Sequence, residues 1–218
     1  MARNAQDALA WSVVIPVKVL AQAKSRLTGL AEADRRQLAL AMAADTVAAA
    51  IRAAAVAAVL VVTDDREVGD AATGLGATVL PDVPAAGLNE AVGYGAAYTH
   101  DRWPARGRAA LAGDLPALQA DELTTALAAA AGHRAAFVRD ADGTGTTLYA
   151  ATPGTDFQPR FGRDSARRHL ADGAAEVQDP GLAGLRRDVD TADDLRHAIA
   201  LGLGPRTGTV LKCARWDT

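Results

Sequence analysis

Three basic side chains near the N-terminus have the type and spacing to bind a polyphosphate. Lys18, Lys24 and Arg26 follow the hydrophobic run 11–17, in the segment IPVKVLAQAKSRL. A loop that leaves a buried strand offers free backbone N–H groups, and cations on such a loop attract phosphate. The glycines of a Walker loop are missing, so these residues alone leave open a second interpretation, that of a solvated basic loop.

Three aspartates indicate a magnesium site. Asp114 comes directly after the hydrophobic run 109–112, and Asp188 and Asp190 follow a later predicted strand. Residues two apart in an extended chain face the same side, and Mg²⁺ commonly takes one or two carboxylates, with phosphate oxygens and waters completing its shell. Asp114 with one or both of the pair could hold the ion. The alternative is structural: a turn or cap role for Asp114, and capping of the last helix by Asp190 or Thr191.

The segments FGRDSARRH and GTGTT form a further candidate group. Gly162 and Ser165 lie at the start of the predicted helix 164–171, whose first N–H groups could receive an anion, and Thr147 could add a hydroxyl. An ordinary helix cap by Asp164 or Ser165 is the alternative. The histidines lack metal-ligand spacing and receive no catalytic role; they are His100, His133, His169 and His197.

These side chains need elements that bring them together, and the sequence predicts strands alternating with helices. The predicted strands cover 11–17, 59–63, 77–80, 109–112, 135–138 and 146–150, with a further strand ending at 187–190. The predicted helices cover 32–55, 67–73, 88–100, 120–131, 164–171 and 192–201. This alternation predicts a mostly parallel sheet with helices on both faces, and ligands bind outside the carboxyl ends of such strands. We expect one domain over 11–203, an N-terminal extension at 1–10 and a C-terminal tail at 204–218.

Composition narrows the class of protein. The 218 residues are 50% hydrophobic and 22% charged, which suits one folded domain. The formal net charge of -3 provides no general basic field for nucleic acid. No apolar run approaches the roughly 20 residues that cross a bilayer, and the N-terminus lacks a signal-peptide pattern. With Cys213 as its one cysteine, the chain is expected in the cytoplasm, with neither nucleic acid nor membrane as partner.

Seven motifs together resemble the phosphoenolpyruvate or 2-phospho-L-lactate guanylyltransferases of coenzyme F(420) biosynthesis. They are VVIPVKVLAQAKSRL, VVTDD, GLNEAV, AGDLPAL, GTGTT, FGRDS and DVDTADDL, and they span Trp11 to Leu201. The resemblance implies a single-domain, Rossmann-like nucleotidyltransferase fold, similar to that of the enzymes that attach a nucleotide to molybdopterin. The first ten residues and the part after Gly204 carry no matching motif.

The resemblance also implies a role for each candidate residue. The phosphorylated three-carbon acid would lie against Thr147, Gly162 and Ser165. The Mg²⁺ ligands would be Asp114, Asp188 and Asp190. The catalytic cations that face the triphosphate of GTP would be Lys18, Lys24 and Arg26. The guanine or ribose side of the nucleotide would fall to Asp64 and Asn89.

The implied reaction is attack by a phosphate oxygen of the acid on the α-phosphorus of GTP, with release of pyrophosphate. A phosphate monoester has a second pKa of roughly 6, so this nucleophile needs no general base. The acid could be phosphoenolpyruvate, 2-phospho-L-lactate or 3-phosphoglycerate; the Ala- and Arg-rich composition resembles actinobacterial chains and favours phosphoenolpyruvate. The expected partners are these small molecules, with hand-over of the product to the next enzyme of the pathway.

Two other functions fit parts of the sequence. Asp188-Val189-Asp190 matches the Asp-x-Asp pattern with which metal-dependent glycosyltransferases hold a sugar nucleotide, although that pattern usually occurs nearer the middle of the domain. A non-catalytic nucleotide-binding regulator could keep the basic loop and lose the metal, but all three aspartates are present. Pyrophosphate release that depends on a phosphorylated acid would separate the three functions.

Overall fold

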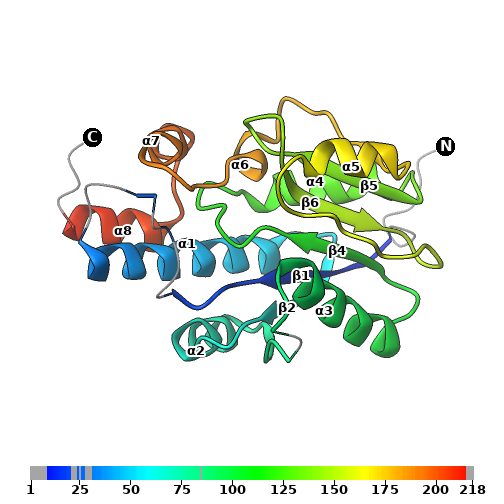
Figure 1. Ribbon diagram of the computed structural model, residues 1–218, viewed down its shortest axis with the longest axis horizontal. Coiled ribbons are helices and arrows are strands. Elements are labelled where there is room, and N and C mark those ends of the chain that lie inside the picture. Colours follow the sequence, from blue (N-terminus) through cyan, green and yellow to red (C-terminus); the bar gives the residue numbers. More distant parts are fainter. Residues whose placement is uncertain (1–8, 21–23, 25, 28–30, 84, 215–218) are drawn as a thin grey trace.

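A seven-stranded sheet forms the centre of the molecule in this computed structural model, which describes residues 9–20, 24, 26–27, 31–83 and 85–214 (Figure 1). The strands lie in the order β3-β2-β1-β4-β6-β5-β7. Their bounds are β1 Trp11–Pro16, β2 Val56–Val62, β3 Thr78–Leu80, β4 Gly107–Leu111, β5 Ala135–Arg139, β6 Thr146–Ala151 and β7 Ala175–Glu176. All neighbouring strands are parallel except β6, which runs antiparallel to both β4 and β5.

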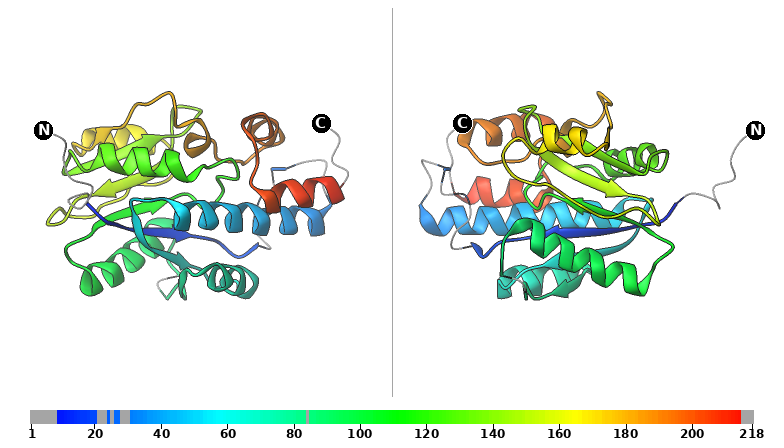
Figure 2. Two further views of the ribbon diagram at one scale, coloured as in Figure 1. Left: turned by 180° about the vertical axis from the view of Figure 1, so that it is seen from behind. Right: turned by 45° about the vertical axis from the view of Figure 1, so that its right-hand side comes forward.

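Helices cover both faces of this sheet, as the alternating pattern predicts (Figure 2). Their bounds are α1 Glu32–Arg52, α2 Arg66–Leu75, α3 Leu88–Arg102, α4 Ala120–Ala130, α5 Ser165–Ala171, α6 Ala183–Arg186, α7 Ala192–Leu201 and α8 Pro205–Cys213. Val13 and Ile15 of β1 pack with α1 and α4, whereas Val14 packs on the other face with residues of α3. Because successive side chains of a strand alternate between faces, a continuous apolar run supplies both cores.

The last part of the predicted sheet differs from the sequence expectation. No strand ends at 187–190; the short helix α6 comes first, and a single backbone bond then ties Val189 to the chain after β4. The Val189 N–H donates to the Asp114 carbonyl at 3.2 Å. The Val189 side chain is fully buried, so Asp188 and Asp190 on either side of it face away from the core. Asp188 and Asp190 therefore face the same side, as the sequence predicts, although no strand is formed there.

The C-terminal segment is helical. Residues 205–213 form α8, which lies along α1 (Figure 1). Asp45 of α1 is 5% exposed, and its carboxylate accepts hydrogen bonds from the backbone N–H of Thr207 at 2.8 Å and of Arg206 at 3.3 Å. The expected tail at 204–218 is thus largely a packed element. Residues 1–8 of the expected N-terminal extension, and residues 215–218, lie outside the described part.

Within the described residues, every helix is too short or too polar to cross a membrane. The longest of them, α1, has 21 residues and carries charged residues at both ends. Its apolar positions, among them Leu38 and Met42, are buried against the rest of the domain.

Candidate active site

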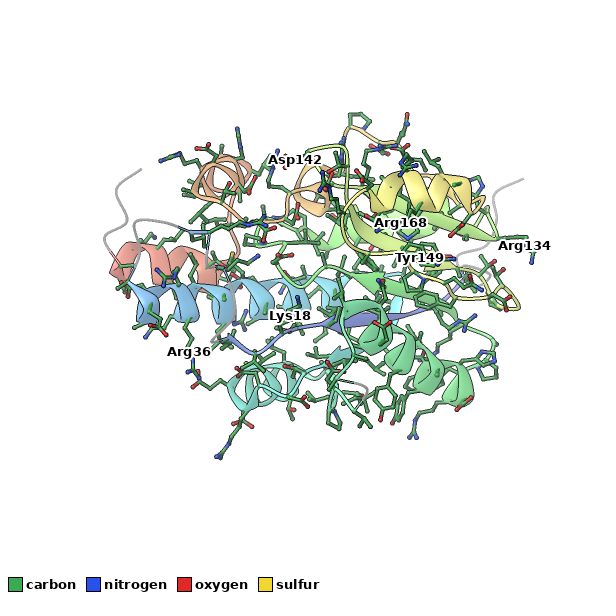
Figure 3. All side chains as sticks on the ribbon, in the orientation of Figure 1. Lys18, Arg36, Arg134, Asp142, Tyr149 and Arg168 are labelled. Atoms are coloured by element: carbon green, nitrogen blue, oxygen red, sulfur yellow. The ribbon has the colours of Figure 1, made fainter. Side chains whose placement is uncertain are left out.

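A cavity of about 870 Å³ opens where β1 and β4 end and β6 begins. Lys18, Lys24 and Arg26 line it from the loop after β1. Asp114 lines it from the turn after β4, and Ala39 and Ala43 of α1 and Leu88 of α3 also line it. A further set of lining residues comes from the chain around β6, α5 and α6: Asp140, Asp142, Thr144, Gly145, Thr146, Gly162, Arg163, Ser165, Asp188 and Asp190. Figure 3 shows Lys18 and Asp142 coming from opposite sides. The loop after β1 therefore forms a basic side of the cavity, and the other side carries most of the aspartates together with one further cation, Arg163.

Lys24 connects these two sides. Its ammonium lies 3.1 Å from Asp190 Oδ1 and also contacts Asp114 Oδ2, and its side chain is only 8% exposed. Burial lowers the pKa of Lys24, but the carboxylates of Asp114 and Asp190 together raise this pKa above its ordinary value. The backbone of Lys24 is left-handed, with φ 58°, a conformation that costs a non-glycine residue about 1 kcal/mol or more. Tertiary contacts hold the lysine there.

Asp188 lies among several other carboxylates. Burial raises the pKa of its carboxyl group to about 7, and the nearby carboxylates of Asp114, Asp140 and Asp190 contribute in the same direction. A cation beside these oxygens would relieve that repulsion.

The acidic oxygens are suited to Mg²⁺. They are hard carboxylate ligands, and Mg²⁺ needs only one or two such ligands from the protein when phosphate and water supply the others. As the side chains are placed, no three acidic, His or Cys groups among the described residues surround a metal position. Lys24 instead bridges two of the oxygens that an ion would use.

The GTGTT segment is folded around Asp140. The carboxylate of Asp140 accepts the backbone N–H of Thr144 at 2.9 Å and of Gly145 at 2.6 Å. A Cβ on residue 145 would lie 2.2 Å from Asp140 Oδ2, so any larger residue there would displace this carboxylate from the turn. Arg186 in turn donates to the carbonyls of Arg139 and Asp140, each at 3.1 Å. Asp140 is not among the candidate site residues of the sequence analysis, although an aspartate that bonds to the backbone a few residues on is a typical turn device.

The structure brings Thr146 into the cavity, whereas Thr147 does not line it. Ser165 Oγ donates to Thr146 Oγ1 at 3.1 Å, and Gly162 lies close by on the same wall. The Thr147 hydroxyl is buried and has no hydrogen-bond partner among the described residues. A choice between two adjacent threonines depends on the direction of the strand's side chains, which the motif by itself does not reveal.

Asn89 has a different environment from the one expected. Its side-chain amide donates to the Phe161 carbonyl at 3.1 Å and accepts the Phe161 N–H at 2.8 Å. It therefore holds the loop that carries Gly162, which adopts φ 112°. Leu88 lines the cavity, but Asn89 does not.

Asp64 lies outside the cavity lining too. It is exposed, and its carboxylate accepts the N–H of Asp82 at 2.9 Å. The next residue, Asp65, is the one that reaches the basic loop: its Oδ2 accepts the Leu20 N–H at 2.9 Å while its Oδ1 caps α2. The cap could have been predicted from an aspartate before a helical run, but the bond to Leu20 connects residues 45 positions apart.

The sheet order and the helix layers define a nucleotidyltransferase-like α/β domain. A nucleotidyl transferase from Methanothermobacter thermautotroptrophicus superposes with a TM-score of 0.61 and 22% identity, covering 88% of this chain and 97% of that chain. The 4-diphosphocytidyl-2C-methyl-D-erythritol synthase of Anaerococcus prevotii DSM 20548 superposes with a TM-score of 0.58 and 14% identity, covering 91% and 98%. At these identities the comparison establishes the fold.

Sequence comparison gives the family. Residues 11–217 match the family described as guanylyl transferase CofC like. A phosphoenolpyruvate guanylyltransferase of Thermomonospora curvata is 55% identical over 93% of this chain and 89% of its own length. Another, from Streptomyces coelicolor, is 51% identical over 92% of this chain and 95% of its own length. The chain belongs to the CofC-like guanylyl transferase family.

Proposed function

We propose that this protein transfers GMP from GTP to phosphoenolpyruvate, giving enolpyruvoyl-2-diphospho-5'-guanosine and pyrophosphate in coenzyme F(420) biosynthesis. The observation that carries the proposal is the single cavity that joins the cations after β1, the aspartates after β4 and α6, and the hydroxyl pair Thr146–Ser165. Relatives that are 55% and 51% identical over nearly the whole chain bear the name of this activity.

The nucleotide occupies the basic side of the cavity. Lys18 and Arg26 are exposed at its mouth, and Lys24 lies deeper, so the three cations face the triphosphate at different depths. Cations fixed in this way stabilise the negative charge that develops as the α-phosphorus is attacked. Neither Asp64 nor Asn89 lines the cavity, and their place on the guanine or ribose side stays a prediction from the resemblance.

The phosphorylated acid occupies the wall formed by Thr146, Gly162 and Ser165. Thr146 offers a hydroxyl group and Gly162 an exposed backbone to a carboxylate or phosphate, and the buried Ser165 hydroxyl supports Thr146 by donating to it. Thr146 takes the place that the motif resemblance gave to Thr147. The closest approach of the acid to the nucleotide then falls near Lys24 and Asp114, between the two walls.

Mg²⁺ would be held by Asp114, Asp188 and Asp190. When bound, the ion neutralises phosphate charge, so that two anions can approach each other. Lys24 already contacts two of these carboxylates; with the ion and GTP present, its ammonium would turn toward a phosphate oxygen.

The chemical step forms one bond and breaks another. A phosphate oxygen of the acid forms a bond to the α-phosphorus of GTP, the bond from that phosphorus to the β-phosphate bridging oxygen breaks, and pyrophosphate leaves with the electron pair. Because the attacking phosphate is largely ionised at neutral pH, no side chain has to remove a proton. The protein contributes alignment and charge neutralisation, which can supply several kcal/mol of the barrier reduction.

The same proposal includes the cellular setting. The protein works in the cytoplasm on small molecules and passes its product to the next enzyme of the pathway, which consumes the diphosphate-linked guanosine.

The deciding experiment is acid-dependent release of pyrophosphate from GTP with Mg²⁺. Phosphoenolpyruvate, 2-phospho-L-lactate and 3-phosphoglycerate are supplied in parallel with a reaction lacking any acid, and ATP replaces GTP as the base control. We expect release only with GTP plus an acid, fastest with phosphoenolpyruvate. A glycosyltransferase would release a nucleoside diphosphate from a sugar nucleotide instead, and a regulator would bind GTP without turnover. Absence of acid-dependent pyrophosphate would overturn the proposal.

A further inference from the structure

His169 lies directly behind the acid-binding wall. Its side chain is fully buried, and its Nδ1 is 3.0 Å from Thr146 Oγ1. On the opposite edge of the ring, Nε2 accepts the Arg160 backbone N–H at 2.9 Å. The ring is enclosed by aromatic groups; those in contact with it are Phe137, Tyr149 and Phe161. The histidine does not line the cavity itself.

These two bonds determine the tautomer of the ring. A backbone N–H can only donate, so Nε2 of His169 must carry a lone pair. The proton of the neutral ring then lies on Nδ1, and Nδ1 donates to Thr146 Oγ1. Burial lowers the pKa of His169 to about 4, so the neutral ring is the form present at neutral pH.

The tautomer in turn determines how the Thr146 hydroxyl is used. A threonine oxygen has two acceptor sites and one proton. His169 Nδ1–H occupies one acceptor site and the Ser165 hydroxyl, at 3.1 Å, occupies the other. The remaining Thr146 proton has no acceptor among the described residues, and Thr146 lines the cavity. The hydroxyl therefore presents a donor to whatever binds there.

We propose that His169 is a positioning residue that fixes the Thr146 hydroxyl as a hydrogen-bond donor to an anionic oxygen of the phosphorylated acid. The inference rests on the proposed function for the identity of that ligand. The same ring also ties the Arg160–Phe161 segment, and hence the loop of Gly162, to β6. Its two nitrogens thus align two parts of the acid-binding wall through one rigid group.

The tautomer can be tested without any reaction. Nuclear magnetic resonance of the wild-type protein with isotope-labelled histidine nitrogens distinguishes a protonated Nδ1 from a protonated Nε2. At neutral pH we expect the His169 resonances of a neutral ring protonated on Nδ1, both with and without the acid. A ring protonated on Nε2, or a charged imidazolium, would overturn the proposal. This outcome does not depend on which acid the enzyme uses as substrate.

The kinetic test uses variants that separate donation from packing. His169→Asn keeps a donor N–H near the place of Nδ1, whereas His169→Phe keeps the aromatic packing and loses the donor. Thr146→Val removes the hydroxyl at nearly constant volume. We expect His169→Phe and Thr146→Val each to raise the KM for the acid by about tenfold to a hundredfold, with the KM for GTP changed less than about twofold. His169→Asn should retain most of the acid affinity.

A double variant provides the sharpest outcome. If His169 acts through the Thr146 hydroxyl, the difference between His169→Phe and His169→Asn in the acid KM disappears in a Thr146→Val background, because both variants lose Nε2 and the hydroxyl that the donor orients is already gone. A difference that persists in that background, or equal losses for GTP and acid in the single variants, would mean that His169 is only structural. His133 is exposed, and His133→Asn is the matched control. Thermal melting tests whether each variant is folded. Should wild-type protein use none of the three acids, the proposed function fails, and the tautomer measurement still decides the geometry.

Discussion

Lys24 connects the basic loop to the aspartates on the other side of the cavity. Its ammonium shares carboxylate oxygens of Asp114 and Asp190 that Mg²⁺ would also use. A buried ammonium without partners would be costly, so the carboxylates stabilise Lys24 while no ligand is bound. Under the proposed function, a bound metal nucleotide would replace those contacts with phosphate contacts. One side chain can therefore serve both the unliganded fold and the liganded site.

Asp188 should show a conflict between stability and activity. Asp188→Asn removes a half-buried charge that Asp114, Asp140 and Asp190 repel. Without Mg²⁺, at slightly alkaline pH, we expect the free energy of unfolding to rise by on the order of 1 kcal/mol, while acid-dependent pyrophosphate release falls by about a hundredfold or more. Denaturant titration with a chelator and the release assay measure the two effects. Near-normal turnover would contradict a role in metal binding.

Thr147 offers a test of which threonine faces the acid. Thr147→Val replaces a buried hydroxyl that has no partner among the described residues with a methyl group of similar volume. We expect the free energy of unfolding to rise by roughly 1 kcal/mol, because the polar group is buried at a cost, and the KM for the acid to stay the same. An increase of the acid KM as large as that of Thr146→Val would return the binding role to Thr147.

At the scale of elements, side-chain carboxylates connect parts of the chain that are far apart in sequence. Asp65 caps α2 and holds the basic loop through Leu20 N–H, and Asp140 organises the turn before β6. Neither group needs to touch a substrate. Their effect is to place the backbone on which the cavity residues are carried.

Asp45 connects α1 to α8 in the same manner. Asp45→Ala leaves the N–H groups of Arg206 and Thr207 without their acceptor at the start of α8. We expect a loss of roughly 2 kcal/mol in the free energy of unfolding, measured by denaturant titration. Asp70→Ala, which removes a surface pair with Arg66, is the control and should cost about 0.5 kcal/mol or less. Equal midpoints for the two variants would show that α8 contributes little.

At the scale of the whole molecule, His169 makes stability depend on pH. Burial is the main reason for its low pKa, with Asp172 opposing and Arg168 and Arg160 reinforcing that shift. The pKa of His169 is 6.5 in the unfolded state and about 4 in the folded state. Between these two pH values the unfolded state therefore binds a proton on His169 that the folded state does not bind. Stability from this group is full above the higher value and is lost as pH falls through that window.

The contribution of His169 to the pH dependence of stability can be measured by comparing the wild type with a variant that does not titrate at this position. We expect the free energy of unfolding of the wild type, minus that of the non-titrating His169→Asn, to fall by on the order of 3 kcal/mol from near pH 6.5 to near pH 4. Above that window the difference should be constant. Parallel curves for the two proteins would show that the folded state binds the His169 proton as readily as the unfolded state does.

Local pattern was sufficient for most elements. Apolar runs predicted β1 to β6, and the helical segments between and after them predicted α1 to α5 and α7. These signals are local, because burial and propensity act over a few neighbouring residues. The strand expected to end at 187–190 is absent, since the chain there is held by the single Val189 bond instead of a ladder.

By itself, the sequence determined the class of fold, the family motifs and the residue types of the cavity, because strand periodicity and motif spacing are encoded along the chain. Only the tertiary structure decided which of two threonines faces the cavity, that Asn89 and Asp64 bind backbone instead of lining it, and that Lys24 lies between Asp114 and Asp190. It also revealed His169 behind Thr146. These facts depend on side-chain direction and on contacts between distant segments, which exist only once the chain has folded.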